Sequence, residues 1–166
     1  MTLDALFQQL YDLPLSAAIR ENNAAFPSIE MLHVLAITLV FGTISVVDLH
    51  LVGYPAHRRS TRRLIAELLP FTWGAFALAI VTGGLMFTSN AVAYAHNVQF
   101  QWKLLAILAA GANMAFFHLT AYRQINDWGD ALPAPLLAKV AGSASLALWV
   151  LVIFFGRWIG FTLSPF

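Results

Sequence analysis

The sequence contains no cysteine and few charged residues. Without cysteine, its 166 residues form no disulfide, thiolate metal site or thiol nucleophile. Charged residues make up 10% of the chain, whereas a soluble domain is about a quarter charged. Hydrophobic residues make up 60%, and the mean hydropathy is +0.73. The composition therefore predicts an integral membrane protein in contact with the lipid bilayer, and the net charge of +1 gives no reason to expect a nucleic-acid partner.

Several motifs that mark enzymes are also missing. The sequence has no glycine-rich phosphate loop, no nucleophile elbow and no HExxH zinc signature. These absences exclude the nucleotide-binding, α/β-hydrolase and metalloprotease classes that the motifs identify. They leave open whether the protein is an enzyme at all.

Four apolar stretches are each long enough to cross a bilayer as a helix, for which about 20 residues suffice. They cover approximately residues 29–52, 64–88, 102–122 and 135–161. The pattern predicts an all-α fold, an up-down bundle of four transmembrane helices in one domain over residues 29–166, with Ser28 as the N-cap of the first span. Residues 1–28 carry Leu3, Leu6 and Leu10 at helical spacing. This spacing predicts a short amphipathic helix that lies at the membrane surface or caps the bundle.

The positions of the basic residues predict the orientation. The first loop contains Arg58, Arg59, Arg62 and Arg63, and basic residues recur near the third loop at Arg123 and Lys139. Basic residues in short loops mark the cytoplasmic side. We therefore expect a multi-pass protein of the bacterial inner membrane with periplasmic N- and C-termini. Four tryptophans fall near the predicted span ends, as interfacial aromatic residues do: Trp73, Trp102, Trp128 and Trp158.

The first span carries four ionisable residues, and such groups at membrane depth are costly and usually functional. Glu30 and Asp48 are eighteen positions apart, about five turns at 3.6 residues per turn, so they share one helix face. His33 lies close to this face, whereas His50 points about 160° away at 100° per residue. We expect Glu30, His33 and Asp48 to face the bundle interior. His50 is expected at the cytoplasmic interface beside His57.

Depth in the membrane sorts these residues into two groups, because the first and third spans of an up-down bundle run parallel. Asp48 falls at the level of His118, and Asn113 lies somewhat deeper in the same half. The outer half contains Glu30, His33, Lys103 and Arg157, with His96 and Asn97 just above them. The sequence therefore predicts one polar cluster in each leaflet.

One interpretation of the histidines is a haem-b site in an electron-transfer subunit, since haem in a helical bundle needs imidazole ligands from facing helices. His33 and His118 are the preferred iron ligands. His96 or Lys103 would be the second iron ligand of an outer site. In an inner site near Asn113, the second ligand would be His50, or the coordination position would stay open. A redox partner or a quinone would then exchange electrons with the haem.

A second interpretation is a non-enzymatic, homo-oligomeric binding or transport module that uses the buried charges Glu30, Asp48, Lys103 and Arg157. The same charges are equally consistent with pairs that only fix helix register, since buried charges are generally paired. Glu30 and His33 have the spacing of a di-metal bundle pair, but the chain lacks the second pair that such a site requires. A scaffold subunit of a larger membrane complex is a further alternative.

Six segments carry a resemblance to a known family: FPSIEMLHVL, FGTISVVDLHLVG, FTWGAFALAIVTGGLMF, YAHNVQFQWKLL, ANMAFFH and GRWIGF. Between Phe26 and Phe161 the chain resembles small bacterial four-helix membrane proteins of unknown function. The positions that match the family pattern are Glu30, His33, Asp48, Trp73, Gly74, Asn97, Lys103, Asn113, His118, Gly156 and Arg157. A more distant, fold-level similarity to cytochrome b-type and copper-resistance membrane proteins implies haem or metal chemistry.

Overall fold

A computed structural model describes residues 2–54, 60–130 and 133–163, and these residues form helices and connections without a strand. In chain order the helices are α1 (Leu3–Tyr11), α2 (Pro14–Glu21), α3 (Ala25–Val52), α4 (Thr61–Ser89), α5 (Ala91–His96), α6 (Val98–Leu119), the 3₁₀ turn η1 (Ala121–Gln124), α7 (Ile125–Trp128) and α8 (Leu136–Thr162). The predicted all-α class is confirmed.

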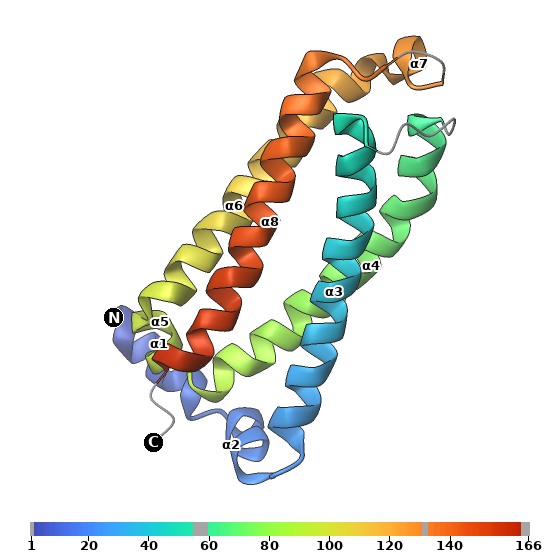
Figure 1. Ribbon diagram of the computed structural model, residues 1–166. Coiled ribbons are helices and arrows are strands. Elements are labelled where there is room, and N and C mark those ends of the chain that lie inside the picture. Colours follow the sequence, from blue (N-terminus) through green and yellow to red (C-terminus); the bar gives the residue numbers. More distant parts are fainter. Residues whose placement is uncertain (1, 55–59, 131–132, 164–166) are drawn as a thin grey trace.

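Four of these helices, α3, α4, α6 and α8, are long and apolar enough to cross a membrane. They alternate in direction along the chain, so the up-down bundle of a multi-pass membrane protein is also confirmed (Figure 1). The first span begins earlier than the sequence predicts. The helix α3 starts at Ala25, so Ser28 lies inside it, and Ala24 occupies the N-cap position without a side-chain hydrogen bond.

The bundle consists of two helix pairs. The helix α3 packs along α4, and α6 packs along α8, while contacts between α3 and α8 join the pairs. In the described part of the chain no comparable contact joins α4 to α6. The α3–α8 contact is close because α8 presents buried small residues, among them Ala138 and Gly142. A Cβ atom on Gly142 would lie 3.1 Å from the backbone oxygen of Asp48.

The C-terminal end of α8 lies at one end of the bundle, together with α1, α2 and α5 (Figure 1). Arg20 holds this end together, because its guanidinium donates to the carbonyl oxygens of Tyr11 at 2.8 Å and Ser89 at 3.2 Å. His96 contacts Asp4 at 3.0 Å and so connects α5 to α1. Of the two predicted roles of the N-terminal segment, the structure shows the cap. Its contact with lipid stays a prediction, consistent with the exposed side chain of Leu3.

We call the opposite end the basic end, after the exposed Arg62, Arg63 and Arg123. The core cluster lies at this end and includes Leu51, Ile65, Phe117 and Trp128. Trp128 was predicted at the membrane interface, but it is buried and donates its indole N–H to the carbonyl oxygen of Ala121 at 3.0 Å. Arg62 forms an ion pair with Asp130 at 3.1 Å. The predicted loop residues His57, Arg58 and Arg59 lie outside the described residues.

Candidate functional site: a cavity between the helix pairs

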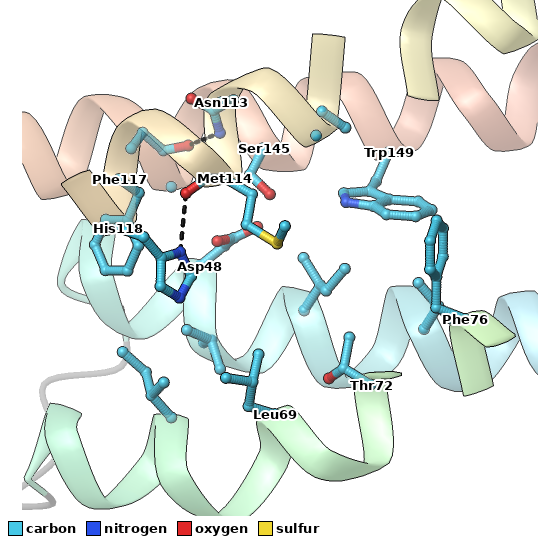
Figure 2. A pocket seen from close by; sticks show the side chains of 18 of the residues that line it. Asp48, Leu69, Thr72, Phe76, Asn113, Met114, Phe117, His118, Ser145 and Trp149 are labelled. Atoms are coloured by element: carbon cyan, nitrogen blue, oxygen red, sulfur yellow. Dashed lines mark hydrogen bonds between the residues drawn. The ribbon is translucent and has the colours of Figure 1, made fainter. Parts of the chain in front are cut away.

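A cavity of about 190 Å³ lies between the two helix pairs, in the half of the bundle next to the basic end. Residues of α3, α4, α6 and α8 line it (Figure 2). Trp73 on α4 and Met114 on α6 line the cavity while 48% and 38% of their surfaces stay exposed. The cavity is therefore partly open, with exposed lining residues on α4 and α6, two helices that share few contacts.

One end of the cavity is aromatic. Phe76 lies edge-on to Trp73 and to Trp149, with ring centroids 6.0 Å and 6.4 Å apart. Trp73 and Phe76 are three positions apart on α4 and therefore lie on one helix face. Trp149 reaches the same place from α8 (Figure 2). These three rings form a surface suited to a flat apolar group or to a cation over a ring face.

Asp48 lies at the other end of the cavity and is 6% exposed. Ser145 of α8 lies beside its carboxyl group (Figure 2). Its second carboxyl oxygen, Oδ2, is buried and has no hydrogen-bond partner among the described residues. None of the ion pairs in this part of the chain includes Asp48. A buried acceptor without a partner is unusual in a native protein and calls for a specific explanation.

His118 projects into the cavity from α6 (Figure 2). Its Nδ1 lies 2.9 Å from the carbonyl oxygen of Met114, which can only accept a hydrogen bond. Nδ1 therefore carries the proton and donates it. In the neutral imidazole this leaves the lone pair on Nε2, so that His118 can accept a hydrogen bond or bind a metal there.

Asn113 and Thr72 also line the cavity, but their hydrogen bonds connect helices. The amide nitrogen of Asn113 donates to the carbonyl oxygen of Ala141 at 2.9 Å and so joins α6 to α8. The hydroxyl of Thr72 has two acceptors in reach, Oγ1 of Thr43 at 2.8 Å and the carbonyl oxygen of Leu68 at 3.0 Å. Its single proton is therefore already engaged by the protein.

The outer half of the bundle is arranged differently. Nδ1 of His33 lies 2.9 Å from Oγ1 of Thr82, and Thr82 in turn donates to the carbonyl oxygen of Leu78 at 2.7 Å. The imidazole rests on Gly83, where an added Cβ would come within 2.9 Å of Cε1. His33 therefore fills the α3–α4 interface. The ammonium group of Lys103 lies along α8, 3.5 Å from where a Cβ of Gly156 would be.

Two predicted members of the buried charge pairs are wrong. Glu30 and Arg157 are exposed on the surface of the bundle, and the guanidinium of Arg157 lies over the ring of Phe161, 4.9 Å from its centroid. The ion pairs among the described residues contain neither Glu30 with Lys103 or Arg157, nor Asp48 with His118. Of the four predicted charges, Asp48 is the one that is fully buried.

The predicted histidine pairs do not meet in this structure. His33 contacts Thr82 and His96 contacts Asp4, so these two rings have different partners. His50 is half-buried and does not line the cavity that holds His118. Asn97 caps α6 and donates to Thr162 of α8 at 2.9 Å, which is a structural role. Within residues 2–54, 60–130 and 133–163 no group of three or more His, Asp or Glu side chains could hold a metal ion.

The sequence predicted that Asp48 and His118 lie at one level with Asn113 somewhat deeper in the same half, and the cavity brings these three residues together. Sequence reasoning missed the aromatic end, because it assigned Trp73 to the interface and did not consider Phe76 and Trp149. It assigned no role to Ser145 either. The spacing of two residues could have indicated this site, because Ser145 and Trp149 are four positions apart and so lie on one face of α8.

A model of a family of unknown function (DUF6644) matches residues 23–162. The match covers most of the chain, so the protein belongs to this family. No curated protein and no solved structure matches the chain. The predicted resemblance to a family without an assigned function is thus confirmed. The similarity to cytochrome b-type and copper-resistance proteins stays a prediction.

Proposed function

We propose that this DUF6644 member is a non-enzymatic binding or transport module that takes a small amphipathic molecule from the lipid phase into the cavity between α4 and α6. Asp48 anchors the molecule. The observation that carries this proposal is the buried carboxyl group of Asp48, which lines the cavity and whose Oδ2 has no hydrogen-bond partner in the described part of the protein. In this proposal the basic end faces the cytoplasm of a bacterial inner membrane.

A buried carboxyl oxygen without a hydrogen-bond partner lowers the stability of the fold. A buried polar atom without a hydrogen bond destabilises a fold by about 1–3 kcal/mol, and an unpaired charge by more. Ionisable residues at membrane depth mark binding or transport sites for this reason. The size of the cavity sets the size of the molecule. Engineered cavities of about 150 Å³ bind benzene, so 190 Å³ accommodates a single-ring compound.

Filling the cavity tests this function. We expect Gly111→Trp to abolish binding of single-ring amphiphiles, because Gly111 lines the cavity and an added Cβ there meets no described atom within 4 Å. Gly84→Trp is the matched control, since Gly84 is equally open but does not line the cavity. The measurement is isothermal titration of the detergent-purified protein with a panel of three probes: 2-phenylethanol, phenylacetate and 2-phenylethylammonium. The proposal fails if no probe binds the wild type, or if Gly111→Trp binds as the wild type does.

A haem-b electron-transfer subunit is the second candidate, and the free Nε2 of His118 is the observation that favours it. His118 is the one histidine among the described residues that line the cavity, and 190 Å³ is below the roughly 300–1,000 Å³ of pockets for larger ligands. The cavity as it stands therefore does not fit a haem with two ligands from this chain. A haem would need a ligand and space from a partner.

An absorption spectrum of the purified protein after haem supplementation decides this second candidate. A haem-b subunit shows a Soret band with resolved α and β bands on reduction, and His118→Ala removes them. His33→Ala is the matched control, because His33 lies in the α3–α4 interface outside the cavity. A featureless spectrum of the wild type rejects the haem hypothesis.

A further inference from the structure

We infer that the ligand of this cavity is a small organic cation: an ammonium group attached to a single apolar ring. The inference rests on the proposed function and names the chemical class of the molecule. It follows from three properties of the cavity, namely its hydrogen-bonding groups, its charge and the position of its aromatic rings.

The hydroxyl of Ser145 is a donor beside the carboxyl group of Asp48, but Oδ2 still has no donor among the described residues. Because Nδ1 of His118 donates to Met114, Nε2 of its neutral form is an acceptor. The hydroxyl proton of Thr72 is already engaged by Thr43 or Leu68. The indole N–H of Trp149 is a second donor of the cavity, on the side of the ring that faces Ser145 in Figure 2, and it lies apart from Oδ2, which has no partner. A ligand that satisfies the Asp48 end must therefore bring hydrogen-bond donors, as an ammonium group does.

The negative charge of the Asp48 carboxylate also favours a cationic ligand. No ion pair of the described residues neutralises Asp48, and the rest of the lining is mostly apolar. In such surroundings a carboxylate attracts a cation much more strongly than it does in water. An anionic ligand would place a like charge against Asp48. The carbonyl groups of a neutral acceptor, such as a quinone, would leave Oδ2 without a donor.

The aromatic end lies at a suitable distance for the rest of the molecule. Ser145, which lies beside the carboxyl group of Asp48, and Trp149 are four residues apart on α8, about 6 Å along the helix axis. A two-carbon chain between a ring and an amine spans a comparable length. The ring then packs on Trp149 and Phe76, whose faces also favour a nearby positive charge.

The test compares two probes of nearly equal size, 2-phenylethylammonium and 2-phenylethanol, by isothermal titration of the full-length protein in detergent. We expect the amine to bind the wild type at least about 30-fold more tightly than the alcohol, which corresponds to one buried charge contact. Asp48→Asn should weaken amine binding by a similar factor and leave alcohol binding nearly unchanged. Asp48→Glu should restore part of the amine affinity. Ser45→Ala, a change one turn away on α3 and outside the cavity lining, should bind both probes as the wild type does.

The possible outcomes test the cationic class of the ligand and the proposed binding function separately. If the alcohol binds as tightly as the amine and Asp48→Asn changes neither, the cation class and the anchoring role of Asp48 are both wrong, and only binding of a ligand in the cavity stands. If neither probe binds, both fail. An ammonium group could belong to a free amine or to a lipid headgroup. Displacement of the amine by phosphatidylethanolamine in nanodiscs, but not by phosphatidylglycerol, identifies the lipid as the source. Binding unaffected by either lipid identifies the free amine.

Discussion

Replacing Asp48 with asparagine should raise the stability of the ligand-free protein. In the wild type the buried Oδ2 has no hydrogen-bond partner among the described residues, and no ion pair there compensates the carboxylate. Asparagine has nearly the same shape but carries no charge, so the cost of burying it is smaller. We expect a gain of about 1–2 kcal/mol in the free energy of unfolding, measured by denaturant titration in detergent micelles. Functional residues commonly lower stability in this way.

Ser45→Ala is the control for this result. The hydroxyl of Ser45 is also buried without a partner in the described part of the chain, but Ser45 does not line the cavity. Its removal should stabilise the protein by up to about 1 kcal/mol while ligand binding stays unchanged. A loss of stability in Asp48→Asn would contradict the account, because it would show that the carboxylate stabilises the fold.

The second large effect is expected at Gly142, where α8 approaches α3 most closely. An added Cβ would lie 3.1 Å from the backbone oxygen of Asp48 and 3.2 Å from Cβ of Leu51. Neither atom can move without displacing the backbone of α3. We expect Gly142→Ala to reduce the free energy of unfolding by about 1–3 kcal/mol and Gly142→Leu to reduce it further, because the two helix pairs are forced apart. Gly142 also lines the cavity, so binding should weaken in both variants.

Gly160→Ala on the same helix provides the comparison. No described atom lies within 4 Å of a Cβ at Gly160, so alanine there should be neutral or stabilise α8 by up to about 1 kcal/mol. Thermal unfolding of the three variants in detergent, followed by circular dichroism, measures the difference. Equal midpoints for Gly142→Ala and Gly160→Ala would show that the helix pairs are not joined through Gly142.

The spans and the depth of the polar residues could be predicted because both depend on position along the chain. Hydropathy identified the four helices, and counting residues placed Asp48, Asn113 and His118 in the same half of the bundle. The direction in which side chains point was less predictable. Glu30 shares a face with Asp48 by periodicity, yet Glu30 is exposed and Asp48 is buried. The helices α3 and α8 diverge toward the end that carries α1 and α2 (Figure 1). At Asp48, α8 packs closely against α3 through Gly142.

The cavity itself could not be predicted from one sequence, because it depends on where neighbouring helices pack closely: Phe87 of α4 stacks on Phe100 of α6, but the two helices share few other contacts. Composition and periodicity do not indicate that α4 and α6 lack the contact that α3 and α8 make. Without this information Trp73 resembles an interfacial anchor and Ser145 a packing residue. The predicted pairs of Glu30 with Lys103 or Arg157 failed for the same reason, since matching depth does not imply facing side chains.

The most direct test of the account combines the stability and the binding of Asp48. It measures the unfolding midpoint of the wild type and of Asp48→Asn, each with and without saturating 2-phenylethylammonium. A ligand at 100 times its dissociation constant stabilises its protein by about 2.7 kcal/mol. The account predicts that Asp48→Asn has the higher midpoint without ligand, and that the amine raises the midpoint of the wild type much more than that of the variant. A variant that is less stable than the wild type and gains as much from the amine would contradict it.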